Sequence, residues 1–211
     1  FARENSNIIL EFKTKSKNIA HLLKTDIPDN VFVSWSLNPQ IFIDHEEHGT
    51  ASLDKRLSCA KSLSDKGVLV GFHFHPIVYY EGYEDDYKEI VHKVMSIFEP
   101  SQIAMISMGT LTFIKPAINK LRSAGLKSKV LQIPMVDAVG KSSYSKEIKA
   151  EIFSNVYDEF RAWHDNLFFY LCMEESSIWE SVFGDFYKSN VDFENALFAS
   201  VSSKMKPIEI T

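Results

Sequence analysis

Short runs rich in β-branched and aromatic residues alternate along this chain with longer stretches whose apolar residues recur at helical spacing. Such an alternation is typical of a parallel sheet whose strands are joined by crossover helices. The expected strands lie near residues 7–14, 30–37, 68–75, 102–108 and 166–172. The sequence therefore predicts an α/β fold.

Two segments between these strands are expected to be crossover helices. Leu53 begins an apolar stripe that stops at Gly67, and Tyr87 begins a second one that ends before Pro100. Apolar residues at this spacing cover one face of a helix, and glycine and proline are its usual end signals.

The second half of the chain is less regular. The segment from Gly125 to Ser143 is expected to be a loop-rich connection with a short strand at 130–133. An amphipathic helix is expected over 144–164, and Ser143 or Ser145 is expected to start it.

With 211 residues, 45% of them hydrophobic, the chain can bury one sizeable core. It has no apolar run near the roughly 20 residues that cross a bilayer, and its two cysteines fit a reducing cytoplasm. The net charge is -5 without a long lysine or arginine cluster, which counts against duplex nucleic-acid binding by bulk electrostatics but leaves a local basic cleft open. Since the chain starts at Phe1 and soon enters an apolar run, we expect a fragment of a larger cytoplasmic protein.

Polar side chains gather where the expected strands end. Alternate residues of a strand share one face, and the carboxyl ends of parallel strands are where open sheets and barrels build their sites. The side chains that this rule brings together are Lys13, Lys15, Ser34, Ser36, Asn38, His73, His75 and Ser107. The sequence therefore predicts a site at this edge of the sheet.

His73 and His75 allow two interpretations. Two imidazoles on one strand face can bind a divalent ion, and with Asp44 or Glu174 they would make a metal-dependent hydrolase in which the ion activates water. Because no acid with supporting spacing follows closely, hydrogen-bonded pocket histidines are the favoured interpretation. A non-catalytic scaffold, in which the polar residues satisfy one another, is a further alternative.

Three other features carry a structural and a functional interpretation. The run Asp44-His45-Glu46-Glu47-His48 looks like a metal box, but is interpreted as lying at the start of a helix that Thr50 or Ser52 caps. Cys172 ends an apolar strand as a buried or a reactive thiol. Tyr79 and Tyr80 are either core residues or rings that stack on a base or cofactor.

Several of these residues also match a known family. Thr14-Lys15-Ser16, Ser36-Leu37-Asn38 and the run Glu47-His48-Gly49-Thr50-Ala51-Ser52 resemble, in order and spacing, the second half of spore photoproduct lyases. Further matching pieces are Leu22-Leu23, Arg56, Gly71-Phe72, Pro76-Ile77 and Glu81-Gly82-Tyr83. The resemblance covers residues 8–98. Beyond it, 107–111 and 138–164 resemble a broader branch described as DNA repair photolyases.

The resemblance implies part of a parallel (β/α) partial TIM-like barrel of the radical S-adenosylmethionine type. Residues 1–211 would be the C-terminal portion of that barrel, and about 126–211 a family-specific extension. In the family, three upstream cysteines bind a [4Fe–4S] cluster that cleaves S-adenosylmethionine, and the adenosyl radical abstracts hydrogen from a thymine-dimer lesion in DNA. Those cysteines are absent here, so the cluster is expected on a missing N-terminal half, and this chain alone is expected to be inactive.

The resemblance also assigns residues to ligands. Lys15 and Ser36 correspond to residues that hold the methionyl carboxylate of the cofactor, and Asn38 is grouped with them. The residues expected to face the substrate are His73, His75, Tyr80 and Ser107; no metal ligand is assigned. His75 stands where the lyase has a small residue against the lesion, which leaves the substrate open. The lyase's hydrogen-donating cysteine belongs to the missing part, so that role is not given to Cys172. Expected partners are the missing half, DNA and a second copy of the chain.

Overall fold

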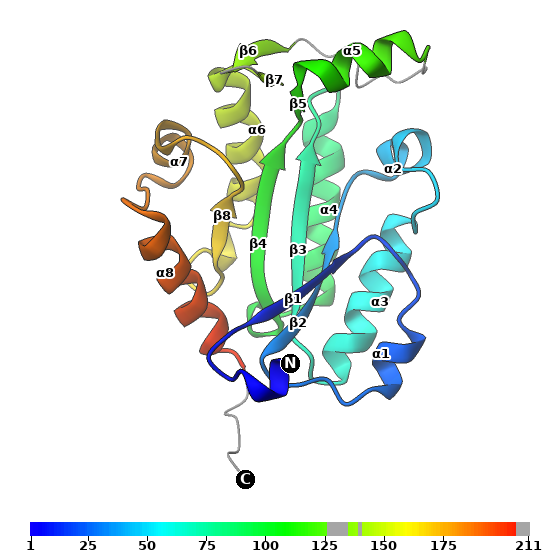
Figure 1. The fold of residues 1–211 in the computed structure, drawn as a ribbon, viewed down its shortest axis with the longest axis vertical. Coiled ribbons are helices and arrows are strands. Elements are labelled where there is room, and N and C mark those ends of the chain that lie inside the picture. Colours follow the sequence, from blue (N-terminus) through cyan, green and yellow to red (C-terminus); the bar gives the residue numbers. More distant parts are fainter. Residues whose placement is uncertain (126–134, 139–140, 206–211) are drawn as a thin grey trace.

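The computed structural model describes residues 1–125, 135–138 and 141–205, arranged as Figure 1 shows. A five-stranded sheet has the order β1-β2-β3-β4-β8, and each neighbouring pair is parallel. Its strands are β1 (Leu10–Thr14), β2 (Val31–Ser36), β3 (Val70–Ile77), β4 (Ile103–Thr110) and β8 (Phe169–Leu171). Each strand overlaps its expected range, so the predicted α/β fold is confirmed.

Helices connect and flank these strands. They are α1 (Ala20–Lys24), α2 (Gln40–Glu46), α3 (Leu53–Asp65), α4 (Tyr83–Ile97), α5 (Lys115–Ser123), α6 (Lys146–Glu159), α7 (Ser176–Phe183) and α8 (Asn190–Ser202). The two expected crossover helices are confirmed as α3 and α4. The helix expected over 144–164 is shorter, because Phe160 and the 3-10 turn after it break the α-helical pattern; Ser145 caps its start by accepting a hydrogen bond from the Ile148 amide.

The two faces of the sheet are covered differently. One face, called the outer face below, carries apolar side chains such as Trp35, Phe72 and Ile106, which pack into one core with residues of α3, α4 and α6. The opposite face, called the inner face below, is the one from which Phe32 and Ser34 of β2 project. It is apolar only at the amino ends of its strands. There a second cluster packs against α8. Every residue of β2 is buried, as expected for a central strand.

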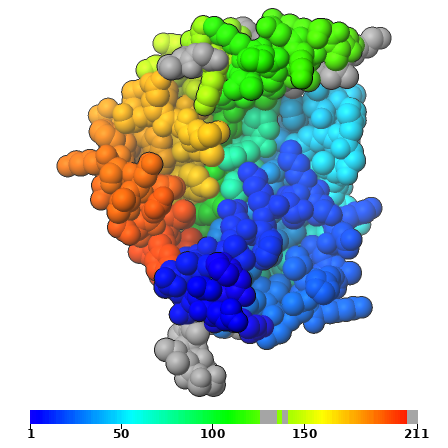
Figure 2. All heavy atoms as spheres, viewed as in Figure 1, coloured from blue at the N-terminus to red at the C-terminus, as the bar shows by residue number. Residues whose placement is uncertain are grey.

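The carboxyl ends of the inner face are polar. In the space-filling view, the blue N-terminal segment and the orange C-terminal helices flank this face, with the central strands between them (Figure 2). The polar side chains therefore lie together at the carboxyl ends of the strands on the inner face, while the main apolar core lies on the outer face of the sheet.

A second, antiparallel sheet stands above the ends of β3 and β4 (Figure 1). Its strands are β5 (Thr112–Ile114), β6 (Val136–Ala138) and β7 (Lys141–Ser143), in the order β5-β7-β6. It lies mostly in the segment predicted to be loop-rich, so that prediction was wrong for these strands: each is only three residues long and gives too little pattern to detect. The strand expected at 130–133 lies outside the described residues.

Within the part of the chain that the structure describes, no helix combines the length and the apolar character needed to cross a membrane.

Candidate functional site

Glu11 joins three strands of the inner face through one carboxylate oxygen. Its Oε1 accepts a hydrogen bond of 2.5 Å from the Ser34 hydroxyl and lies 2.5 Å from Nε2 of His73. Burial raises the pKa of Glu11, but the hydrogen bonds with His73 and Ser34 outweigh burial and lower that pKa overall. Burial lowers the pKa of His73. A neutral His73 therefore donates Nε2–H to an ionised Glu11, and within the part of the chain that the structure describes its buried Nδ1 has no hydrogen-bond partner.

A second chain of contacts runs through His75. Lys13 Nζ lies 3.4 Å from Nδ1 of His75, and Nε2 of His75 lies 2.8 Å from the Ser107 hydroxyl. Ser107 in turn lies opposite Tyr170 of β8 in the parallel pairing of β4 with β8. Since an ammonium only donates, Nδ1 is the acceptor, and Nε2 carries the proton that is directed at Ser107.

The environment of His75 keeps its imidazole neutral. Burial and then the nearby charge of Lys13 lower its pKa to about 3. A histidine held in this way does not withdraw a proton from Ser107 near neutral pH, so the pair is unsuited to nucleophilic catalysis. The ring instead packs flat on Gly109, where an added Cβ would lie 3.1 Å from Nε2.

The metal-hydrolase interpretation is not favoured by this arrangement. The rings of His73 and His75 meet edge to face at 5.0 Å, yet their Nε2 atoms engage Glu11 and Ser107. The proposed third ligands lie elsewhere, because Asp44 accepts a hydrogen bond from Gln40, and Glu174 binds Lys149 and Thr110. In residues 1–125, 135–138 and 141–205, no three His, Cys, Asp or Glu side chains come together as a metal site would require.

Lys15 and Asn38 converge on one carboxylate. Lys15 Nζ and Asn38 Nδ2 donate to Oε1 of Glu47 at 2.5 and 2.7 Å, and Arg56 Nη2 donates to Oε2 at 2.6 Å. Ser36 is buried beside them, and its carbonyl accepts from Arg56 at 2.8 Å. The structure thus brings together the three residues expected at the cofactor.

The interpretation of the acidic run 44–48 needs correction. Its first three residues belong to α2, a helix that was not predicted, and Glu47 follows that helix as a buried residue. Ser52 does stand at the N-cap position of α3, but its side chain makes no capping hydrogen bond. Glu47 is drawn inward because Arg56, which is fully buried, requires a counter-charge.

Tyr80 lies away from the other expected substrate contacts. Its hydroxyl donates to Asp86 at 2.6 Å and it lines a cavity of about 590 Å³ between α2 and the start of α4. Burial, followed by Asp86, raises the pKa of Tyr80. Tyr79 packs against the rings of Tyr83 and Tyr144, as a core residue would.

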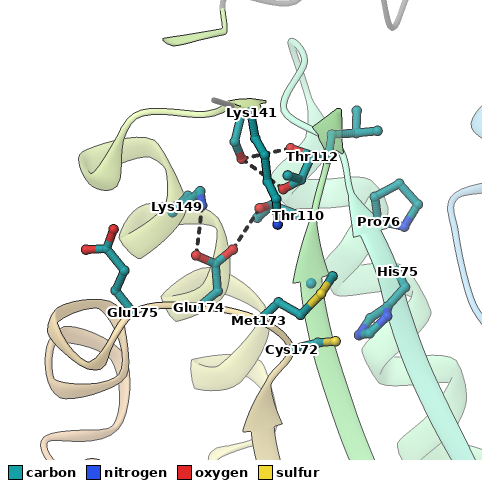
Figure 3. A pocket seen from close by; sticks show the side chains of 13 residues that line it. His75, Pro76, Thr110, Thr112, Lys141, Lys149, Cys172, Met173, Glu174 and Glu175 are labelled. Atoms are coloured by element: carbon teal, nitrogen blue, oxygen red, sulfur yellow. Dashed lines mark hydrogen bonds and ion pairs between the residues drawn. The ribbon is translucent and has the colours of Figure 1, made fainter. Parts of the chain in front are cut away.

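A different cavity of about 490 Å³ opens beside His75 (Figure 3). Its walls come from the ends of β3 and β4, the small sheet, α6 and the segment after β8. On one wall Lys149 Nζ donates to Glu174 at 2.8 Å, and Thr110 donates to the other oxygen of Glu174 at 3.0 Å. Cys172 lies on the side of His75, and burial raises the pKa of its thiol.

The rim of this cavity includes a strained residue. Met173 has a φ of 57°, a left-handed conformation that bulky side chains rarely adopt, and its side chain is 85% exposed. Such conformations cluster at ligand sites, where the surrounding structure holds them in place. The cavity beside His75 is therefore the best candidate for a substrate pocket among the described residues.

Sequence reasoning missed Glu11, Lys149 and Tyr170, and it interpreted Glu47 as lying at the start of a helix rather than beside Lys15 and Asn38. Glu11 was detectable, because it alternates with Lys13 on the same strand face. The other three reach the site through contacts between distant segments, for which the local pattern holds no signal.

The family model for spore photoproduct lyase matches residues 1–133. This chain belongs to the spore photoproduct lyase family. Two spore photoproduct lyases illustrate the relation. The one from Geobacillus sp. (strain Y412MC61) is 28% identical over 123 residues, which is 57% of this chain and 36% of the relative. The one from Bacillus subtilis (strain 168) is 33% identical over 85 residues, 40% of this chain and 25% of the relative.

Solved structures of spore photoproduct lyase share the fold. A mutant with bound AdoMet and dinucleoside spore photoproduct has a TM-score of 0.67 at 23% identity, over 78% of this chain and 51% of that chain. Another mutant, with dinucleoside spore photoproduct, has a TM-score of 0.69 at 23% identity, over 78% of this chain and 52% of that chain. The chain thus has the partial TIM-like fold of radical S-adenosylmethionine enzymes, and it spans about half of these structures.

Proposed function

We propose that this chain is part of a radical S-adenosylmethionine enzyme that acts on a photoproduct in DNA, and that it contributes contacts to cofactor and substrate. The observation that carries the proposal is the donor set of Lys15 and Asn38. An ammonium and an amide at adjacent strand ends already share a carboxylate oxygen at 2.5 and 2.7 Å. This is the chemistry needed to hold the methionyl carboxylate of S-adenosylmethionine.

The residues fit the cofactor but not its iron–sulfur cluster. S-adenosylmethionine beside a reduced cluster supplies a carbon-centred radical that abstracts hydrogen from the substrate. Such a cluster is bound mainly by cysteine thiolates, whereas this chain has two cysteines in all. We therefore assign the cluster to an N-terminal half of the same protein, with residues 1–211 as the C-terminal portion of one barrel.

The substrate is assigned to the region around His75 and Ser107. His73 and His75 lie on the inner face with Ser107, and the cavity bounded by Lys149 and Glu174 continues this region. Its wall from 141–175 lies beyond the family match of 1–133 and belongs to the proposed extension of about 126–211. The substrate preference of this chain would then depend on its own C-terminal part. Tyr80 takes part only if its hydroxyl leaves Asp86.

DNA with a pyrimidine photoproduct is the proposed substrate, and the relatives support it. The solved spore photoproduct lyases include complexes with dinucleoside spore photoproduct.

The two free cysteines agree with a reducing cytoplasm as the compartment.

The substrate half of the proposal is tested with the full-length parent protein, purified without oxygen and reduced. Ultraviolet-irradiated DNA containing spore photoproduct or cyclobutane dimers is supplied separately, and restored thymine is measured by chromatography. Thymine recovered from one lesion, with slower recovery by Ser107→Ala, would support the proposal. If neither lesion is consumed while S-adenosylmethionine is cleaved, the substrate is not a DNA photoproduct.

A further inference from the structure

Glu47 is the centre of a buried cluster that ties the end of β1 to the end of β2. Its side chain is 5% exposed and is bound by Lys15, Asn38 and Arg56. Burial raises the pKa of Glu47, but the hydrogen bonds from Lys15, Arg56 and Asn38 together lower it. The carboxylate is therefore ionised.

The charges of this cluster do not cancel. Arg56 is fully buried, and it also donates to the carbonyls of Ala51 and Ser36 at 2.8 Å and to the Thr50 hydroxyl. The charges of Arg56 and Glu47 thus neutralise each other. Lys15, whose side chain is 34% exposed, brings one positive charge beyond this balance.

Lys15 is held at both ends. Its carbonyl accepts from the Ala51 amide at 3.0 Å, and its ammonium donates to Glu47 at 2.5 Å. An ammonium has three N–H donors, so two remain for a ligand after Glu47 has taken one. A lysine side chain that swings freely loses rotamer entropy when a ligand captures it, whereas one already fixed does not.

Asn38 is oriented by the same carboxylate. Its Nδ2 donates to Glu47 Oε1, while its Oδ1 accepts from the Tyr87 hydroxyl at 3.0 Å, which fixes the direction of the amide. Glu47 needs neither Lys15 nor Asn38 to neutralise its charge, because Arg56 already does so. The convergence of both donors on Oε1 therefore fixes the positions of the Lys15 ammonium and the Asn38 amide, in addition to stabilising the carboxylate.

We infer that Glu47 is a positioning residue, which holds Lys15 and Asn38 in place for the carboxylate of S-adenosylmethionine while Arg56 neutralises its own charge. This inference rests on the proposed function, because it requires that Lys15 meets the cofactor. Glu47 itself does not touch the ligand. Its effect is to lower the cost of assembling a positively charged carboxylate site.

The test compares two cofactors that differ only in the carboxylate. The full-length parent, loaded with its cluster, is titrated by calorimetry with S-adenosylmethionine and with its decarboxylated analogue. Glu47→Gln should weaken binding of S-adenosylmethionine by about tenfold, the range expected for losing a charged hydrogen bond, and binding of the analogue by less than about twofold. Asp44→Asn, an exposed carboxylate hydrogen-bonded to Gln40, is the matched control and should change neither.

Glu47→Asp is measured beside Glu47→Gln, because Glu47→Gln leaves Arg56 buried without a counter-charge. Thermal melts of both variants show whether either has lost its fold. Aspartate keeps the charge but draws the oxygen back from Lys15, so the same selective loss is expected. Equal losses for both cofactors, or none, in the folded variant would overturn the inference. If the wild type binds both cofactors with equal affinity and Lys15→Ala leaves both affinities unchanged, the placement of Lys15 at the cofactor is wrong as well.

Discussion

The ammonium of Lys13 lies 3.4 Å from Nδ1 of His75, and the Ser107 hydroxyl lies 2.8 Å from Nε2 of the same ring. His75 is thus held between a cation and a hydroxyl on the inner face. Together with burial, the cation makes this histidine a neutral hydrogen-bonding group rather than a base, which suits contact with an uncharged base of a substrate.

The depressed pKa of His75 makes stability depend on pH. Below pH 6.5 an unfolded chain takes up a proton at this residue, whereas the folded protein does so only near pH 3, so the free energy of unfolding falls as the pH is lowered through this window. We expect His75 to contribute a loss of about 2 kcal/mol between pH 7.5 and pH 5. Urea titrations should show a smaller loss for His75→Gln. His21→Gln, a change at an exposed histidine, is the control. If the pH dependence of His75→Gln is the same as that of the wild type, the imidazole of His75 does not have the depressed pKa.

Gly109 provides the space that His75 occupies. A Cβ at this position would lie 3.1 to 3.3 Å from three atoms of the imidazole, so Gly109→Ala should destabilise the protein by about 1–3 kcal/mol. In a His75→Ala background the same change should cost less than about 0.5 kcal/mol. Thermal or urea unfolding of the four proteins completes the cycle, and an equal cost in both backgrounds would contradict the contact.

Lys149 and Glu174 form a buried ion pair in the wall of the cavity, with side chains 13% and 4% exposed. Lys149→Met leaves a buried carboxylate without its cation, so a loss of about 3–5 kcal/mol is expected. Lys146 lies on the same helix as Lys149, and its ammonium binds the exposed Glu175. Lys146→Met removes this exposed ion pair and should lower the free energy of unfolding by less than about 1 kcal/mol. Urea unfolding compares the two, and similar small losses would mean that water reaches Glu174.

The chain alone is expected to self-associate. β1 is an edge strand of the main sheet, and its Phe12 is 52% exposed. Exposed strand edges and apolar side chains promote association between chains. Light scattering of the 211-residue protein should give a mass above that of one chain, and Phe12→Lys should lower it. A monomer at micromolar concentration would contradict this expectation.

The sequence supported the fold better than the site. Strand periodicity was sufficient to place Lys13 with His75, because alternation and parallel order determine which side chains share a face. It was insufficient for Glu47, whose role depends on Arg56 nine residues later and on Lys15 from another strand. Tyr80 shows the opposite case: it follows a strand as a site residue would, but its hydroxyl turns to Asp86, a partner that local pattern does not reveal.

The most direct test of the radical mechanism is the release of 5′-deoxyadenosine from S-adenosylmethionine. The full-length parent is purified without oxygen, its iron and sulfide are determined, and the wild type is reduced beside Lys15→Ala. We expect a [4Fe–4S] cluster in both proteins, 5′-deoxyadenosine from the wild type, and a raised cofactor requirement in Lys15→Ala. A wild type with neither cluster nor cleavage would contradict the assignment of this chain to a radical S-adenosylmethionine enzyme.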